Sequence, residues 1–312
     1  MRIIFFGSDN FAVLPLKALI SNGYEVCLVV TQPDKKKGRG MRFMPTAVKE
    51  AAPELKLKIF QPADINSDDS IGFLKGFTPD LFVVIAYGQK LSKDFLSIPK
   101  TMALNVHASL LPKYRGAAPI NWAIIKGETK TGNSLMKIVP EMDAGAVILQ
   151  KERDVLESDD AVTMEEKLSS DAAFLLIEGL KAIEKGKYDL AEQDKTKVSF
   201  APKLKKTDGL INWEKSAAEI NDLVRGCLNW PGAFTYYKGR ILKIFKAKAL
   251  KQETRPGFGL PGQVIDTSDN MLKVAAGKGA LSIERLQLEG KNRMSTKDFI
   301  QGNKISTGEK LG

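Results

Sequence analysis

The sequence of 312 residues contains a single histidine, His107, and only two cysteines, Cys27 and Cys227. The cysteines lie far apart, with no CxxC pair and no neighbouring histidine, so the sequence predicts neither a disulfide framework nor a zinc site. Most transition-metal sites need histidine or cysteine ligands, and their scarcity argues against a transition-metal enzyme. We therefore expect no bound metal.

Long apolar runs are also missing. No segment approaches the roughly 20 apolar residues that a membrane helix needs, and the apolar run near the N-terminus is too short for a secretory signal. The segment that follows the first predicted strand has a single glycine, Gly7, and lacks GxGxxG there, and the chain has no GxxxxGK[ST] and no GxSxG pattern. These features disfavour a dinucleotide site, an ATP site and a covalent acyl-enzyme. We expect a cytoplasmic protein without a membrane partner, and nothing in the sequence indicates an obligate protein partner.

Positive charge is present in excess, and it is unevenly distributed. The net charge is +10, and residues 201–312 alone contain 20 basic and 11 acidic side chains. Such an imbalance predicts an acidic partner for the last third of the chain. A basic face that only improves solubility is the alternative.

The first half of the chain alternates short apolar runs with amphipathic segments, which predicts an α/β domain with a doubly wound, mostly parallel, Rossmann-like sheet. Its strand runs are almost continuously apolar, as in a sheet covered on both faces. Two further strands flank the MDAG loop, and a helix follows over about 161–187. The five first runs are RIIFFG (2–7), EVCLVVTQ (25–32), KIFQ (58–61), DLFVVIAYG (80–88) and ALNVH (103–107).

A different pattern begins after a polar, lysine-rich stretch. One helix over 216–228 is followed by alternating strands with glycine-rich turns, which predicts a C-terminal antiparallel OB-like β-barrel. We expect a first domain over 1–188, a linker over 189–206 and a second domain over 207–312.

The histidine stands in a chemically informative place. Asn105 and His107 occupy positions i and i+2 of a predicted strand, so both side chains leave the same face. An amide can donate a hydrogen bond to a carbonyl oxygen that gains charge, and an imidazole can move a proton near neutral pH. Asp143 is the best candidate to hold the ring by accepting its other N–H. A buried imidazole bonded to backbone carbonyls, and an aspartate that only forms a turn, are the plainer readings.

Basic residues cluster after the second strand and again in the linker. The loop over 33–45 contains two glycines and flanking prolines, which suits an arm that closes over a phosphate backbone. An ordinary solvated loop is the alternative. With the basic second domain, these clusters favour a nucleic acid as the partner. The candidate contacts are Lys35, Lys36, Lys37, Arg39 and Arg42 in the loop, and Lys203, Lys205 and Lys206 in the linker.

Several motifs, in this order along the chain, resemble the methionyl-tRNA formyltransferases. They are VTQPDKKKGRG (30–40), NVHASLLPKYRGAAPINWAI (105–124), MDAG (142–145), FAPKLKKTDGLINW (200–213) and NWPGAF (229–234). The resemblance runs from the first strand to KDFIQG near the C-terminus. It departs modestly, with Ala144 where many relatives have threonine and SDN after Gly7 where a Thr-Pro pair is common.

The resemblance implies transfer of a formyl group from 10-formyltetrahydrofolate to the α-amino group of methionine on initiator tRNA. It implies that Asn105, His107 and Asp143 are catalytic, and that the basic loop, Arg39 above all, enters the acceptor stem. The folate contacts that it implies are Ser109, Leu110, Leu111 and Pro112, with Ile85, Ala86, Tyr87 and Gly88 lining the pterin pocket.

Two other functions compete with this one. A folate-dependent formyltransferase that acts on a small metabolite would share the chemistry without needing a basic second domain. A non-catalytic RNA-binding protein with an inert α/β domain would not bind folate at all.

Overall fold

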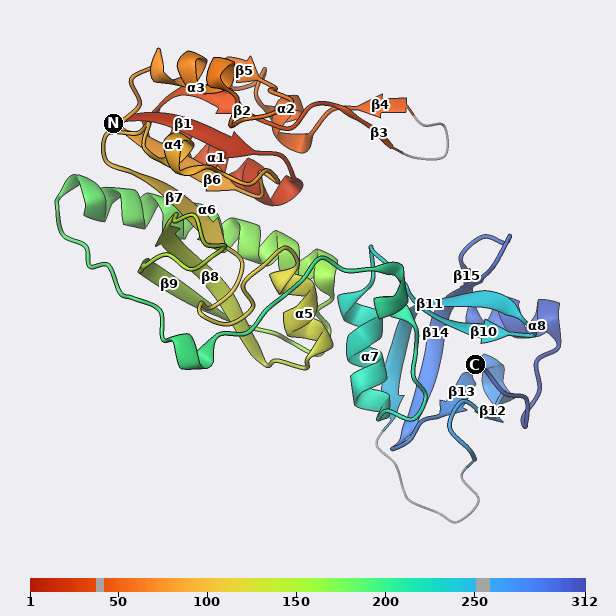
Figure 1. Cartoon of the computed structure of the whole chain (residues 1–312). Coiled ribbons are helices and arrows are strands. Elements are labelled where there is room, and N and C mark those ends of the chain that lie inside the picture. Colours follow the sequence, from red (N-terminus) through yellow and green to blue (C-terminus); the bar gives the residue numbers. More distant parts are fainter. Residues whose placement is uncertain (38–41, 251–258) are drawn as a thin grey trace. The chain divides into compact units, whose positions relative to one another are not determined.

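The computed structural model describes residues 1–37, 42–250 and 259–312 (Figure 1). The chain forms two compact units. Unit 1 consists of Met1–Pro119, Lys130–Asp154 and Glu165–Ala201, and unit 2 consists of Ile120–Thr129, Val155–Met164 and Pro202–Gly312. No helix in the described ranges is long and apolar enough to cross a membrane.

Unit 1 is built on a seven-stranded sheet in the order β5-β2-β1-β6-β7-β8-β9. The first five strands in this order run parallel, and β8 and β9 pair antiparallel at one edge. This arrangement confirms the mostly parallel sheet. The strands are β1 (Arg2–Gly7), β2 (Glu25–Val30), β5 (Ile59–Phe60), β6 (Leu81–Ile85), β7 (Met102–His107), β8 (Lys130–Lys137) and β9 (Val147–Asp154).

The sheet is buried on both faces. Ile3 and Phe5 point to one face of β1, Ile4 and Phe6 point to the other, and all four are fully buried. A strand with this environment needs apolar residues at every position, which explains the continuous runs in the sequence. The helices that lie wholly in unit 1 are α1 (Val13–Ser21), α2 (Ala47–Ala51), α3 (Asp68–Lys75) and α4 (Lys93–Leu96), with 3-10 turns η1 (Asn10–Ala12) and η2 (Lys195–Lys197). Helix α6 (Ala161–Glu184) belongs to unit 1 from Glu165 onward, and α5 (Pro119–Ile125) belongs to unit 2 except for its first residue.

The basic segment that we expected to be a loop forms a hairpin. Strands β3 (Lys35–Lys37) and β4 (Arg42–Met44) pair antiparallel, with Lys36 opposite Phe43. The expectation of a plain loop was wrong for Lys35–Lys37 and Arg42–Met44 because lysine and arginine do not predict strands, whereas the pairing of these two segments satisfies backbone groups of both. Arg39 lies outside the described residues.

Helix α6 is tied to the edge strand β9 through a nearly buried carboxylate. Asp171, whose side chain is 4% exposed, bonds to Arg153, and it lies 3.1 Å from Lys151 Nζ. The Arg153 hydrogen bond holds the pKa of Asp171 below its ordinary value of 3.8, although burial acts in the opposite direction. The ionised carboxylate therefore stabilises the fold at neutral pH.

Replacing Asp171 with asparagine is expected to lower the free energy of unfolding at neutral pH by about 1–2 kcal/mol, since both cationic partners are partly exposed to solvent. A carboxylate whose pKa is lowered in the folded state stabilises the folded protein at pH values above its ordinary pKa. This contribution is lost as the pH falls through the pKa of the folded state. The difference between variant and parent in urea unfolding should therefore shrink in acid. Glu178→Gln, an exposed change in the same helix, should have little effect, and a pH-independent difference for Asp171→Asn would contradict the assignment.

Unit 2 contains an antiparallel sheet in the order β10-β11-β14-β13-β12, with β15 pairing with β14. Helix α7 (Ala217–Gly226) begins with a capping box in which Ser216 and Glu219 bond to each other's backbone N–H groups. The antiparallel sheet confirms the OB-like prediction. Its elements are β10 (Ala233–Tyr237), β11 (Arg240–Leu250), β12 (Val264–Asp266), β13 (Leu272–Ala275), β14 (Ala280–Leu288) and β15 (Met294–Ser295), with α8 (Thr296–Asn303), η3 (Lys206–Gly209) and η4 (Ser268–Asn270).

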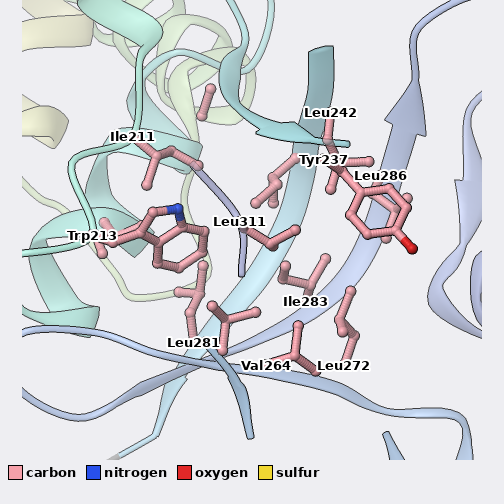
Figure 2. Packing of buried hydrophobic residues seen from close by; sticks show 14 of the residues in the cluster. Ile211, Trp213, Tyr237, Leu242, Val264, Leu272, Leu281, Ile283, Leu286 and Leu311 are labelled. Atoms are coloured by element: carbon pink, nitrogen blue, oxygen red, sulfur yellow. The ribbon is translucent and has the colours of Figure 1, made fainter. Parts of the chain in front are cut away.

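The strands of unit 2 surround one apolar core (Figure 2). Leu242, Leu281 and Leu286 from the sheet are almost completely buried there. Trp213 joins them from the segment before α7, and its indole N–H donates to Thr235 Oγ1 at 3.0 Å, so its one polar atom is satisfied. The alternation of the strands thus separates this core from a basic exterior.

Candidate active site

The candidate site lies at the C-terminal end of β7, where the chain leaves the sheet. His107 is the last residue of this strand and pairs with Ser134 of β8. Asn105, two residues earlier, lies on the same face of β7 and is partly exposed. The two side chains predicted to act together therefore share one side of the sheet.

Both nitrogens of the His107 ring face oxygen atoms. Nε2 lies 2.9 Å from the carbonyl oxygen of Tyr114, and because a carbonyl can only accept, Nε2 bears the ring proton. Nδ1 lies 3.7 Å from Asp143 Oδ2, within ion-pair range but beyond a hydrogen bond. The ring N–H that we expected Asp143 to accept goes to Tyr114 instead, and the carboxylate faces the nitrogen that can gain or lose a proton.

Asp143 is held in an unusual backbone conformation. It lies in the loop between β8 and β9 with a φ of 50°, in the left-handed region that most side chains avoid. Its Oδ2 accepts the N–H of Gly116 at 2.8 Å, and its side chain is 15% exposed. The carboxylate is thus fixed beside the ring rather than free in solvent.

The segment predicted to contact folate is rigidly bonded to its surroundings. Ser109 is fully buried, and its hydroxyl donates to the carbonyl of Lys113 at 2.6 Å. The backbone N–H of Leu111 donates to Ser134 Oγ at 3.0 Å. Only Leu110 and Pro112 of the four predicted residues are partly exposed, so only these two have side-chain surface available for a ligand.

The second predicted folate segment follows β6. Ile85 and Tyr87 are buried, whereas Ala86 and Gly88 are exposed and have positive φ angles of 48° and 89°. Any ligand contact from this segment must therefore come from Ala86, Gly88 or the backbone. Burial raises the pKa of the Tyr87 phenol, which keeps that hydroxyl neutral.

An unsatisfied donor lies next to Gly88. The side-chain nitrogen of Gln32 is buried and has no hydrogen-bond partner in the described parts of the chain. It is 4.0 Å from the position that a Cβ on Gly88 would take. A buried donor without a partner is costly, so this corner of the unit suits a ligand that brings a hydrogen-bond acceptor.

The predicted tRNA contacts belong to different units. In unit 1, Lys35, Lys36 and Arg42 are exposed on the β3–β4 hairpin, and Lys36 Nζ lies 5.5 Å from the centre of the Phe43 ring. Lys37 is also in β3. In unit 2, the exposed residues are Lys203, Lys205 and Lys206. Across the residues that the structure describes, no cluster of three or more His, Cys, Asp or Glu side chains could hold a metal ion.

Sequence reasoning missed three residues that contact this site. Arg115 and Gln193 bond to each other, and Gln193 bonds to the loop of Asp143. Ser199 Oγ accepts the N–H of Tyr114 at 2.9 Å. Gln193 and Ser199 lie in the stretch over 189–206 that we expected to be a linker, and a lysine-rich stretch of this kind offers no local signal of such contacts.

The chain matches two family models, one described as "Formyl transferase" over residues 1–180 and one described as "Formyl transferase, C-terminal domain" over residues 203–304. Together with the Asn-His-Asp site on a mostly parallel sheet, they define a formyl transferase. A solved structure of HypX from Aquifex aeolicus in complex with tetrahydrofolic acid has the same fold, with a TM-score of 0.62 and 18% identity over 96% of this chain and 47% of that one.

The most specific matches are to curated methionyl-tRNA formyltransferases. The protein of Thermodesulfovibrio yellowstonii is 45% identical over 98% of this chain and 97% of its own length. That of Citrifermentans bemidjiense is 41% identical over 100% and 96%, respectively. The chain belongs to the methionyl-tRNA formyltransferase family.

Proposed function

We propose that this enzyme transfers the formyl group of 10-formyltetrahydrofolate to the α-amino group of methionyl initiator tRNA in the cytoplasm. The observation that carries the proposal is the similarity to methionyl-tRNA formyltransferases along the whole chain, second domain included. The geometry of Asn105, His107 and Asp143 supports it. We further propose that no membrane or obligate protein partner takes part.

The chemistry requires one bond to form and one to break. The neutral amine of methionine attacks the formyl carbon, and a new C–N bond forms while the carbonyl electrons move to oxygen. Collapse of this adduct breaks the bond to the folate nitrogen, and one proton passes from the amine to that nitrogen. The products are formylmethionyl-tRNA and tetrahydrofolate.

The three site residues are suited to these charge changes. The Asn105 amide would donate to the oxygen of the tetrahedral adduct, which can be worth a few kcal/mol. His107 would move the proton through Nδ1, because Nε2 is occupied by the Tyr114 carbonyl. Asp143 would stabilise the ring while it holds the extra proton. Leu110, Pro112, Ala86 and Gly88 would offer surface to the folate, and Gln32 would supply a donor.

A formyltransferase for a small metabolite is not favoured as the alternative. The curated relatives that match both domains are methionyl-tRNA formyltransferases, and a small substrate gives no reason for the charge excess over 201–312.

The direct test is formyl transfer from 10-formyltetrahydrofolate to charged initiator tRNA, measured beside an amino sugar nucleotide and glycinamide ribonucleotide. We expect rapid formylation of the methionyl-tRNA and background rates with both small amines. Preferential formylation of a small amine would refute the proposed substrate, and absence of any folate-dependent transfer would refute the reaction.

Affinity for methionyl-tRNA is expected to fall steeply as salt is added, since each neutralised phosphate releases counterion. Replacing Lys35 and Lys36 together with glutamine should weaken binding and reduce the slope of log K against log salt by about 1 for each phosphate that the variant no longer neutralises. Filter binding over a salt series measures both quantities. Lys93→Gln, an exposed change in the same unit, should leave them unchanged, and an unaltered slope in the double variant would remove the hairpin from the RNA-binding surface.

A further inference from the structure

A single side-chain amide connects the predicted linker to the loop that carries Asp143. Gln193 Nε2 donates to the carbonyl oxygens of Asp143 and Gly145, both at 2.8 Å. These carbonyls lie on either side of Ala144, so one amide group holds two points of the same short loop. Gln193 is 50 residues from Asp143 in the sequence, and all of these residues belong to unit 1.

The orientation of that amide is determined by Arg115. Its Nε and Nη2 both donate to Gln193 Oε1, at 3.0 and 2.8 Å. A guanidinium group can only donate, so the oxygen of the amide must face Arg115 and the NH2 group must face the two carbonyls. Arg115 is itself 6% exposed, which leaves its planar group little freedom to move.

The loop needs such support because its backbone is strained. A left-handed φ at a residue other than glycine costs about 1 kcal/mol or more and persists only when the surroundings enforce it. Asp143 has this conformation. On the other side of Ala144, the backbone of Gly145 packs closely against β8, where a Cβ would lie 1.8 Å from the Lys137 carbonyl oxygen. The amide of Gln193 thus enforces the conformation in which the carboxylate faces the ring.

The same stretch of chain supports the other partner of the imidazole. Ser199 Oγ accepts the Tyr114 N–H, and the Ser199 carbonyl accepts the N–H of Arg115 at 2.9 Å. The carbonyl of Tyr114 in turn accepts the His107 N–H. Gln193 and Ser199 therefore support the segments that supply both oxygen atoms facing His107, and their own hydrogen bonds go to those segments and not to the ring.

From these contacts we infer that Gln193 is a positioning residue for formyl transfer, which acts by holding Asp143 against His107 Nδ1, with Arg115 orienting its amide. The inference rests on the proposed function. It assigns to the stretch before the second domain a catalytic-support role that is separate from RNA binding. The hydrogen bonds of Gln193 contribute to the rate by fixing the position of Asp143. A displacement of about 1 Å at a catalytic group can cost on the order of 100-fold in rate.

The test uses Gln193→Glu in the full-length enzyme. The carboxylate keeps the shape of the side chain and both bonds from Arg115, but it presents an acceptor to two carbonyl oxygens and so releases the loop. We expect kcat for formylation of methionyl-tRNA to fall about 10- to 100-fold, with unchanged KM for tRNA and folate. Gln193→Ala, which removes the amide without adding charge, should show the same pattern and serves if the glutamate variant does not fold.

A role exerted through Asp143 has a specific signature in a double-mutant cycle. In an Asp143→Asn background, where the carboxylate is already absent, either change at Gln193 should cause no further loss of single-turnover rate. An equal loss in both backgrounds, a loss confined to KM, or full activity of the single variants would overturn the inference. Failure of the parent enzyme to formylate methionyl-tRNA would refute the proposed function instead, so the two failures are distinguishable.

Asn66→Ala provides a matched control. Asn66 also joins two segments of unit 1 through its amide, donating to the Lys90 carbonyl at 2.9 Å and accepting the Ser92 N–H at 2.8 Å. Its loss should lower the free energy of unfolding, as at Gln193, without the fall in kcat. An equal fall in kcat for Asn66→Ala would mean that general destabilisation explains both results.

Discussion

Replacing His107 with alanine is expected to reduce kcat for formyl transfer by about 100- to 10,000-fold, the range typical of a lost acid–base group. The affinity for methionyl-tRNA should stay within a factor of two or so, because the basic residues that are proposed to bind it are unchanged. Single-turnover formylation and filter binding measure the two quantities separately. Simultaneous loss of activity and tRNA binding would argue against a purely chemical role for the ring.

Glutamine at position 107 separates the two functions of the imidazole. Its amide nitrogen can take the place of Nε2 and donate to the Tyr114 carbonyl, which accepts from the ring at 2.9 Å in the parent. A glutamine side chain cannot accept and release a proton near neutral pH. We expect His107→Gln to fold like the parent and to be almost as inactive as the alanine variant, whereas substantial activity would show that proton transfer by this residue is unnecessary.

Replacing Asp143 with asparagine is expected to lower kcat by about 100-fold or more, since the charge that faces Nδ1 at 3.7 Å is removed while the shape is kept. The amide oxygen can still accept the Gly116 N–H, so the loop should remain folded. Urea unfolding and single-turnover rates should therefore diverge, with stability nearly unchanged and rate greatly reduced. Retention of parental kcat would remove Asp143 from the catalytic group.

Glu141→Gln is a suitable control for that experiment. Glu141 lies in the same loop, is 78% exposed and is 3.5 Å from Arg115 Nη1. Because the carboxylate of Glu141 is largely exposed to solvent, its ion pair with the buried Arg115 is expected to contribute only about 1 kcal/mol, so this variant should keep nearly full activity. A large loss in Glu141→Gln would indicate that any charge change in the loop disturbs the site.

The order of the elements could be predicted from local patterns. Continuous apolar runs identified the buried strands of unit 1, and alternation identified the antiparallel strands of unit 2, because burial on two faces or on one dictates the side-chain period. The spacing of Asn105 and His107 placed both on one face of β7 for the same reason. Short helices such as α4 and the β3–β4 hairpin escaped prediction because their residues have weak or opposing propensities.

The contacts that surround the site could not be predicted without the three-dimensional structure. Asp143 contacts His107, Gly116 and Gln193, and its bonds to Gly116 and Gln193 span 27 and 50 residues of sequence. The contact of His107 with Tyr114 spans only seven residues, but it depends on the path of the chain after β7. Hydrogen bonds of this kind leave no periodic signal, since each depends on where two loops meet. For the same reason, the contacts that Gln193 and Ser199 make with the site could not be foreseen in a stretch that was expected to be a linker.

The sequence by itself determined the two kinds of sheet, the placement of the amide and the imidazole on one strand, and the bias of positive charge toward the C-terminal third. Each follows from short-range periodicity or from counting charges, which need no coordinates. Only the tertiary structure decided which nitrogen of His107 bears the proton and what holds Asp143 beside the other one. Those features arise where separate loops pack together, and the free energy of that packing is not encoded in any one of them.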